Sequence, residues 1–446
     1  MSADPSRVST LTGISRRELI GTAVAGATPI ASAGAVPIKR RRGPKGFLWG
    51  TAISAYQSEG NNVNADAWLM ENIRPSMFKE RSGDACDSYH RYGEDFAIAG
   101  KLGFNCYRLG IEWARIEPSE GQFSNAELDH YERVLTACRA QGLRPIVTFN
   151  HFTTPLWFAE RGGFEVADAP ATFARYCRKV AERLGGLMHM ATTFNEANIA
   201  LLVALLPKSP AGAALAKASL AAAVKATGSP RFSRLAYADP KVITPVMQEA
   251  HRRAYAAMKS ARPELPVGLT LTTQDIQSVG SPALVDRYRN ALYGDWVGVA
   301  RDHSDFFGVQ TYTRFRFDEH GMVPAPPGAE LTLSGYEFYP QALPATIRWA
   351  HQTIGKPIYV TENGIGTHDD RRRIAFIDQA LDGVRQCLDE GIPVHSYLYW
   401  SLLDNFEWTS GYNIPFGLVA VDRTTFKRTL KPSALHLGEI ARRNLV

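Results

Sequence analysis

Two glutamates follow apolar runs that have the composition of buried strands. Glu362 comes after the β-branched and aromatic run 357–361 and precedes an Asn-Gly turn signal. Glu196 comes after the run 190–194 and stands beside Asn195. A single glutamate at a strand end is most often a solvated rim residue. Two of them, each next to an Asn, indicate a paired-carboxylate enzyme in which one carboxyl handles protons and the other acts as nucleophile or base.

The elements that must position these glutamates alternate between short apolar runs and amphipathic stretches. Helices are expected over residues 126–141 and 170–184, the first of them capped by Ser124 and Gly142. Eight strands are expected, at residues 47–54, 106–111, 145–149, 190–194, 267–272, 306–312, 357–361 and 395–401. This alternation predicts an α/β chain folded as a single (β/α)₈ TIM barrel, with its active site at the C-terminal ends of the strands. A doubly wound open sheet is the alternative, but no G-x-G-x-x-G follows the first strand.

The strand ends of such a barrel open onto one mouth. Amide, ionisable and aromatic side chains are expected there: Gln57, Arg108, His151, Asn195, Glu196, Tyr312, Glu362, Trp400, Glu407 and Trp408. Amides and carboxylates bind sugar hydroxyls, and aromatic faces pack against the C–H side of a sugar ring. Taken singly, Arg108 also fits a buried ion pair, His151 a core histidine and Trp400 core packing. Their convergence beside two glutamates favours a sugar site.

Other chemistries lack their motifs. The chain has no P-loop, no H-E-x-x-H, no G-x-S-x-G and no His/Cys cluster, so neither a cofactor nor a metal is expected. Its five cysteines are scattered, without a C-x-x-C pair, and are interpreted as small buried hydrophobes. Much of the net charge of +6 comes from residues 16–17 and 39–42, so no nucleic-acid partner is predicted.

The N-terminal residues carry the pattern of an export address. A twin-arginine pair at residues 16–17 precedes a Gly/Ala-rich run that ends in small residues at 31–33. Residues 1–33 are therefore expected to be a twin-arginine signal peptide, placing the mature protein in the periplasm or outside the cell without stable membrane insertion. A disordered N-terminus and a mitochondrial transit peptide are the alternatives. Residues 34–45 are interpreted as a basic flexible lead-in and residues 46–446 as the (β/α)₈ domain.

Several separate blocks recur in the order of one known family. They are residues 47–52, 57–60, 87–92, 107–108, 111–118, 151–152, 155–157, 194–196, 361–364 and 400–408. From about Gly46 to near the C-terminus the chain thus resembles glycoside hydrolase family 1, the family of β-glucosidases and β-galactosidases built on a (β/α)₈ barrel. It departs from the family pattern at Ala191 and Ala197, where Trp and Pro are common, and at Gln310, where Asn is usual. The segment 197–245 also lacks the usual Gly/Pro-rich pattern, and looks like a lengthened fourth loop and helix.

The resemblance implies a role for each residue of the predicted mouth. Glu362 would be the nucleophile and Glu196 the acid/base. Arg108 and Tyr312 would steady the nucleophile, and Trp400 would form the platform under the sugar ring. The remaining residues would hold the sugar in the innermost subsite: Gln57, His151, Asn195, Glu407 and Trp408.

These roles predict a retaining β-glycosidase that forms a covalent glycosyl-enzyme intermediate. Its expected partner is a small-molecule glycoside, a terminal unphosphorylated β-D-glucoside, galactoside or fucoside, because the carboxylate of Glu407 would repel a phosphate. A transglycosidase shares all these residues. A catalytically silent sugar-binding barrel is a further alternative, but it has no need of both Glu196 and Glu362. The oligomeric state stays open.

Overall fold

The computed structural model describes residues 40–207 and 209–446. Eight parallel strands close into a barrel in the order β1-β11-β10-β7-β5-β4-β3-β2. Their bounds are β1 Leu48–Ala52, β2 Cys106–Gly110, β3 Arg144–Asn150, β4 Met190–Phe194, β5 Val267–Thr272, β7 Phe306–Gln310, β10 Ile358–Asn363 and β11 Val394–Trp400. The predicted barrel is confirmed, and each expected strand is present with ends that differ by no more than two residues.

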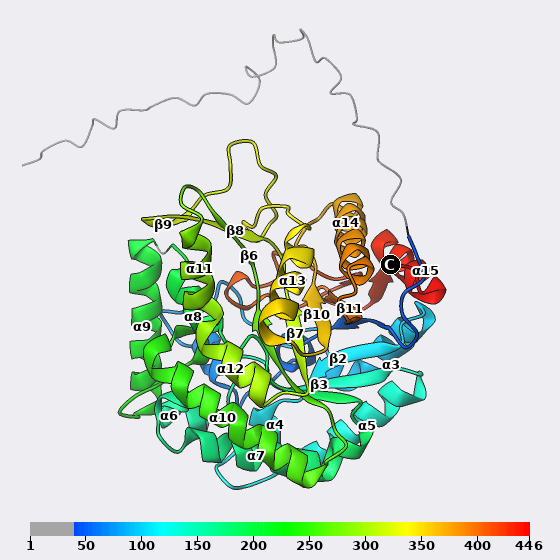
Figure 1. The fold of residues 1–446 in the computed structure, drawn as a ribbon. Coiled ribbons are helices and arrows are strands. Elements are labelled where there is room, and N and C mark those ends of the chain that lie inside the picture. Colours follow the sequence, from blue (N-terminus) through cyan, green and yellow to red (C-terminus); the bar gives the residue numbers. More distant parts are fainter. Residues whose placement is uncertain (1–39, 208) are drawn as a thin grey trace, which may run out of the picture. The chain divides into compact units, whose positions relative to one another are not determined.

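Helices surround the barrel on its outside (Figure 1). Helix α7 packs against α5 and α10, and α14 packs against α13 and α15. The ring consists of α3 Ser88–Lys101, α5 Asn125–Ala140, α7 Ala169–Leu184, α10 Pro240–Ala261, α12 Asp295–Asp302, α13 Ala342–Ile354, α14 Asp370–Asp389 and α15 Pro432–Arg443. The two helices that the sequence predicts are α5 and α7. As expected, the Ser124 hydroxyl caps α5 by accepting a hydrogen bond from the Glu127 N–H.

Strand β2 shows how the sequence separates the inside of the barrel from its outside. Successive side chains of a strand point to opposite faces. Tyr107 and Leu109 belong to the large core shared with the surrounding helices. Cys106 points the other way, into an apolar layer formed by six barrel strands: Leu48, Cys106, Ile146, Met190, Phe306 and Leu398. Arg108 is two residues nearer the strand end and fully buried, so the interior changes from apolar to polar towards the mouth.

The connections at the mouth carry additional elements. Short helices lie between strands and ring helices: α1 Ala55–Glu59, α2 Asp66–Asn72, α4 Trp113–Ile116, α6 Leu156–Glu160 and α11 Ala283–Arg289. After β4, α8 Ile199–Leu205 and α9 Pro210–Thr227 precede α10, which confirms the expected lengthened fourth connection. Strands β6 Asp275–Ser278, β8 Arg314–Asp318 and β9 Gly321–Val323 form a small sheet, and β12 Val419–Val421 pairs with β13 Arg428–Leu430.

The chain ends of the described region are joined. The Arg41 N–H donates to the Val446 carbonyl at 2.8 Å and the Val446 N–H donates back at 2.9 Å. Residues 41–43, which the sequence assigns to a flexible lead-in, are thus attached to the C-terminal end, because their backbone completes a short antiparallel bridge there. Among the described residues, the folded region therefore begins before residue 46. The predicted signal segment 1–33 lies outside the described residues.

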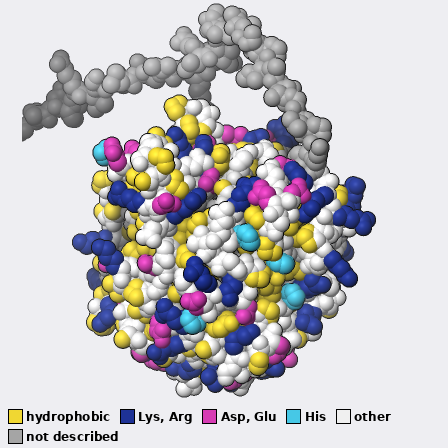
Figure 2. All heavy atoms as spheres, viewed as in Figure 1, with side chains coloured by type: hydrophobic (Ala, Val, Ile, Leu, Met, Phe, Trp, Pro, Cys, Tyr) yellow, Lys and Arg dark blue, Asp and Glu magenta, His cyan; other side chains and the backbone are white. Residues whose placement is uncertain are grey.

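The surface in view mixes both signs of charge. Basic and acidic side chains are interspersed over the face shown in Figure 2, without a large patch of one sign on that face. Among residues 40–207 and 209–446, no helix combines the length and apolar character that crossing a bilayer requires.

Candidate active site

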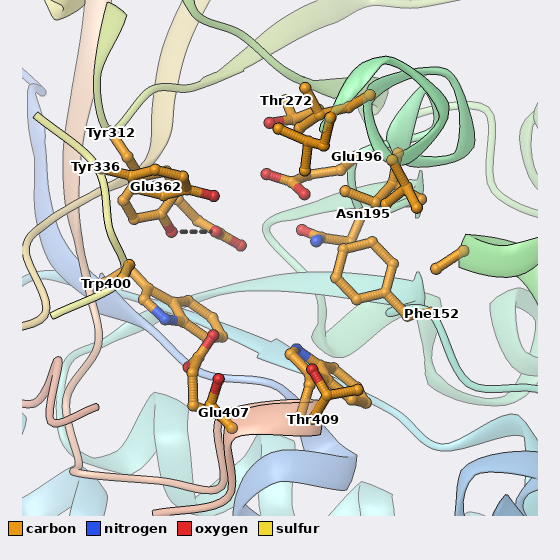
Figure 3. A pocket seen from close by; sticks show the side chains of 18 of the residues that line it. Phe152, Asn195, Glu196, Thr272, Tyr312, Tyr336, Glu362, Trp400, Glu407 and Thr409 are labelled. Carbon is orange, nitrogen blue, oxygen red and sulfur yellow. Dashed lines mark hydrogen bonds between the residues drawn. The ribbon is translucent and has the colours of Figure 1, made fainter. Parts of the chain in front are cut away.

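A pocket of about 340 Å³, open to solvent, lies at the C-terminal ends of the barrel strands. Nine of the ten predicted site residues line it: Gln57, His151, Asn195, Glu196, Tyr312, Glu362, Trp400, Glu407 and Trp408. The tenth, Arg108, lies fully buried and reaches Glu362 and Asn195 by hydrogen bonds. In Figure 3, Glu362 and Tyr312 lie on one side and Glu196 and Asn195 on the other. The two carboxyl groups point into the same space.

Glu362 ends β10 with its carboxyl group held at both oxygens. The Arg108 Nη1 donates to Oε1 at 2.5 Å, and the Tyr312 hydroxyl donates to Oε2 at 2.6 Å. Burial raises the pKa of Glu362, while the Arg108 charge and the Tyr312 hydrogen bond lower it. Burial and the neighbouring Glu362 charge raise the pKa of Tyr312 well above 10, so its hydroxyl stays a donor. Both partners favour the ionised form of Glu362.

Glu196 lies just beyond the end of β4 and has no direct cationic partner among the described residues. Burial, followed by the negative charge of Glu362, raises the pKa of Glu196 well above its usual range. A hydrogen bond to Thr272 and the more distant Arg108 charge oppose this only in part. The surroundings therefore favour the protonated form of Glu196, while Arg108 and Tyr312 favour the ionised form of Glu362.

Asn195 has its amide oriented by two buried donors. Its Oδ1 accepts from Arg108 Nη2 at 2.5 Å and from Gln310 Nε2 at 2.8 Å. A side-chain amide has one acceptor oxygen and one donor nitrogen. With the oxygen occupied by two donors, the nitrogen of Asn195 is directed to the pocket, where it can donate to a ligand hydroxyl. Gln310, the residue that departs from the usual Asn, thus contributes to the site from behind Asn195.

Glu407 and Gln57 form a polar pair at another wall of the pocket. Gln57 Nε2 donates to Glu407 Oε2 at 3.3 Å and to the Phe406 carbonyl at 2.9 Å, while its own Oε1 accepts from the Ser54 hydroxyl. Burial and the charge of Glu362 raise the pKa of Glu407 to about 8. At pH 7 without a ligand this carboxyl is therefore mostly protonated. A protonated Glu407 repels a phosphate less strongly than the carboxylate that the sequence predicts. In neither form does Glu407 carry the positive charge that would bind a phosphate.

Aromatic rings provide the flat surfaces of the pocket. His151 stacks with Trp400 at 5.5 Å between ring centroids, and Trp408 stacks on Tyr56 at 5.8 Å with an interplanar angle of 9°. Burial and the charge of Arg108 lower the pKa of His151 well below 6.5, so the imidazole is neutral. A neutral imidazole has one donor and one acceptor nitrogen, which suits a hydroxyl partner.

The backbone around the pocket is strained. Three non-glycine residues that line it have positive φ: Phe152 at 71°, Glu196 at 45° and Trp408 at 48°. This left-handed conformation costs about 1–3 kcal/mol per residue and persists only where the surroundings impose it. Such strain is concentrated at functional sites, and here it orients the side chains of a catalytic candidate and of two aromatic wall residues.

Sequence reasoning missed part of the pocket lining. The missed residues include Phe152, Thr272, Arg234, Phe315 and Tyr336. Phe152 follows His151 directly, and Thr272 ends a predicted strand, so strand-end counting could have found both. The others come from long connections whose sequence shows no signal of where they face. In the described part of the chain, no group of three or more His, Cys, Asp or Glu side chains has an arrangement that could hold a metal ion.

Comparisons with known proteins agree with this geometry. The family model described as Glycosyl hydrolase family 1 matches residues 39–281 and 297–446. A β-glucosidase of an Agrobacterium species is 30% identical over 439 residues, covering 90% of this chain and 95% of that protein. A β-galactosidase of Sulfolobus acidocaldarius is 27% identical over 489 residues, with 90% and 95% covered.

Solved structures show the same similarity. The apo structure of β-glucosidase 1317 has a TM-score of 0.86 and 47% identity, covering 89% of this chain and 98% of that one. A β-glycosidase from Pyrococcus horikoshii has a TM-score of 0.78 and 30% identity, with 91% and 96% covered.

Proposed function

The chain belongs to glycosyl hydrolase family 1, and from this premise we propose that it is a retaining β-glycosidase that removes a terminal, unphosphorylated β-linked sugar through a covalent glycosyl-enzyme intermediate. The glycoside hydrolase activity follows from the family. The observation that carries the finer proposal is the pair Glu196 and Glu362, whose carboxyl groups share one pocket while Arg108 and Tyr312 donate to Glu362 alone. Retention requires carboxyl groups about 5–5.5 Å apart, one to attack and one to protonate.

In the proposed mechanism Glu362 attacks the anomeric carbon as the bond to the leaving oxygen breaks. Glu196 gives its proton to that oxygen. Esterification then removes the negative charge of Glu362, which is a cause of the raised pKa of Glu196. The pKa of Glu196 falls as a result, and the carboxylate can take a proton from the water that hydrolyses the ester. The Asn195 amide nitrogen donates to the sugar 2-hydroxyl, a contact that strengthens in the transition state.

The expected sugar is a neutral hexose such as glucose, galactose or fucose. Gln57, His151 and Glu407 provide donors and acceptors for hydroxyls, and Trp400 provides a ring face. Among the described residues that line the pocket, Arg234 is the sole arginine or lysine. A 6-phosphate needs a cationic partner. Arg234 is poorly suited to that role because its guanidinium already lies next to the carboxyl group of Asp66.

A nucleophile variant tests the mechanism. Glu362→Gly should lose at least about 10⁴-fold in kcat on aryl β-glycosides, and added azide or formate should restore turnover by replacing the missing carboxylate. NMR of the first product formed by the wild type should show the β-anomer. An α-anomer, or an active Glu362→Gly variant without azide, would contradict the assignment. Glu196→Gln is the matched control. It retains Glu362, so azide should not act in place of the nucleophile in this variant.

We also propose that residues 1–33 direct twin-arginine export. The support is the arginine pair at residues 16–17 and the presence of five free, buried cysteines, which suits folding in a reducing compartment before export. Replacing both arginines with lysine should retain the protein in the cytoplasm. Normal secretion of that variant would show that the leader is of another kind.

A further inference from the structure

The helix that follows the acid/base candidate turns an apolar stripe towards the pocket. Ile199, Leu202 and Val203 have the spacing i, i+3 and i+4, which is one face of α8, and Leu206 follows directly after the helix; all four line the pocket. Together with Phe315 of β8 they form what we call the apolar wall. Leu202 is buried and belongs to the main core, and Ile199 and Leu206 pack against that core, as Leu201 and Leu205 do. The stripe thus contacts the core with part of its surface and lines the pocket with the rest.

The apolar wall lies where the leaving group must depart. Helix α8 begins three residues after Glu196, whose proton goes to the leaving oxygen in the proposed mechanism. Ile199, Val203 and Leu206 are only partly buried, so these side chains face the open space of the pocket. Water against an apolar surface is displaced favourably by an apolar ligand. A sugar hydroxyl placed there would lose its hydrogen bonds to water and find no partner on the wall side chains.

The apolar path continues beyond the pocket. A second cavity of about 360 Å³ shares Leu206, Phe315, Ser334 and Tyr336 with the first. Its further lining includes the apolar residues Pro207, Met322, Val323, Pro324 and Ala325, together with Arg316. Arg314 and Glu337, which also line it, neutralise each other in an ion pair. In Figure 1, α8 and the β8–β9 hairpin lie on the same side of the barrel, as this shared lining requires.

We propose that this enzyme prefers β-glycosides whose leaving group is an apolar alkyl or aryl alcohol over those in which it is a second sugar, and that the apolar wall provides this preference. The inference rests on the proposed function, because the position of the leaving group follows from the role of Glu196. It assigns a specificity role to Ile199, Leu202, Val203, Leu206 and Phe315. Four of these residues belong to the segment 197–245, which departs from the family pattern, so the inference assigns leaving-group binding to part of that segment.

The test compares hexyl and methyl β-D-glucoside, whose leaving groups differ by five methylene groups and little in reactivity. Each methylene group that becomes buried favours binding about fourfold. For the wild type, kcat/KM for the hexyl glucoside should exceed that for the methyl glucoside at least about tenfold, and should also exceed that for cellobiose. A hexyl-to-methyl ratio near one, or cellobiose as the better substrate, would overturn the inference.

Variants of the wall locate the effect. Val203→Asn and Leu206→Gln should each lower the hexyl-to-methyl ratio at least about threefold. Both positions are partly exposed, so the new amides stay hydrated and thermal melting should show folded protein. Ala204→Gln, on the exposed face of the same helix, is the matched control and should keep the ratio of the wild type. Wall variants that retain the full ratio would refute the assignment.

Binding separates this inference from the proposed function. Hexyl and methyl 1-thio-β-D-glucosides resist cleavage, and their dissociation constants can be measured by calorimetry with the wild type. The hexyl compound should bind at least about tenfold more tightly. Equal affinities overturn the inference even if hydrolysis proceeds. Tight hexyl binding without hydrolysis of any β-glycoside overturns the proposed function and leaves the apolar wall as a binding feature.

Discussion

Gln310 should act on the reaction through Asn195 without touching the substrate. Its Nε2 donates at 2.8 Å to the same amide oxygen that accepts from Arg108, and this orients the Asn195 nitrogen towards the pocket. The variant Gln310→Met keeps the length of the side chain and removes the donor. The Gln310 Oε1 has no hydrogen-bond partner among the described residues, so removing it breaks no further hydrogen bond. The Asn195 Oδ1 still accepts from Arg108 in the variant. Folding stability should therefore change little.

The size of the effect follows from the hydrogen bond that is lost. A neutral hydrogen bond contributes about 0.5–1.5 kcal/mol, so Gln310→Met should lower kcat/KM on a β-glucoside about 2- to 13-fold. Asn195→Ala removes the hydrogen bond to the 2-hydroxyl itself. Because this bond strengthens in a charged transition state, it is expected to contribute about 1.5–3 kcal/mol. This variant should lose about 10- to 150-fold.

The assay compares a 4-nitrophenyl β-glucoside with its 2-deoxy analogue for the wild type and both variants. If Gln310 acts through the 2-hydroxyl contact, each variant should lose activity on the parent substrate and little on the 2-deoxy substrate. Gln310→Asn, which restores an amide on a shorter side chain, should recover part of the loss. Equal losses on both substrates would refute the reasoning and give Gln310 a purely structural role.

Three further perturbations test the charges of the site and of the core. Arg108→Met removes the cation that lowers the pKa of Glu362, so the acidic limb of the pH profile of kcat/KM should move to higher pH. An unmoved limb would show that Arg108 does not control the ionisation of the nucleophile. Glu196→Gln cannot titrate, so the basic limb should vanish, and the loss should be larger for methyl than for 4-nitrophenyl glucoside, whose leaving group needs no proton; equal losses would speak against an acid role. Arg428→Met leaves Asp95 buried without its cation and should cost about 3–5 kcal/mol in urea unfolding, whereas a loss below about 1 kcal/mol would mean that the carboxyl finds other partners.

The barrel and its inner site are encoded locally enough to be predicted. Each strand is a short apolar run, and in a parallel barrel the residues at the ends of such runs must share one mouth. This places Asn195, Glu362 and Trp400 from the sequence alone. Arg108 follows from the same reading, because it lies near the end of the second predicted strand. The backbone strain at Glu196 has no comparable signal, since it arises from packing around the strand end.

The outer pocket could not be predicted for a different physical reason. The stripe Ile199, Leu202, Val203 and Leu206 has the same periodicity as a stripe that faces a core, and nothing local distinguishes a core from a cavity. The raised pKa of Glu407 has no local signal either. Burial and the charge of Glu362 raise its pKa to about 8, and both depend on neighbours that are distant in the chain.

One buried guanidinium connects the charge of the nucleophile to the recognition of the sugar. Arg108, on β2, donates to Glu362 on β10 and to Asn195 after β4, so it joins three strands at the mouth. In the proposed mechanism Glu362 loses its charge when the ester forms, and the bond from Arg108 to Glu362 then weakens. Asn195 still accepts from Arg108 and from Gln310 in that state. The donor to the 2-hydroxyl therefore stays oriented during hydrolysis of the ester, and a defect at Gln310 should slow both chemical steps.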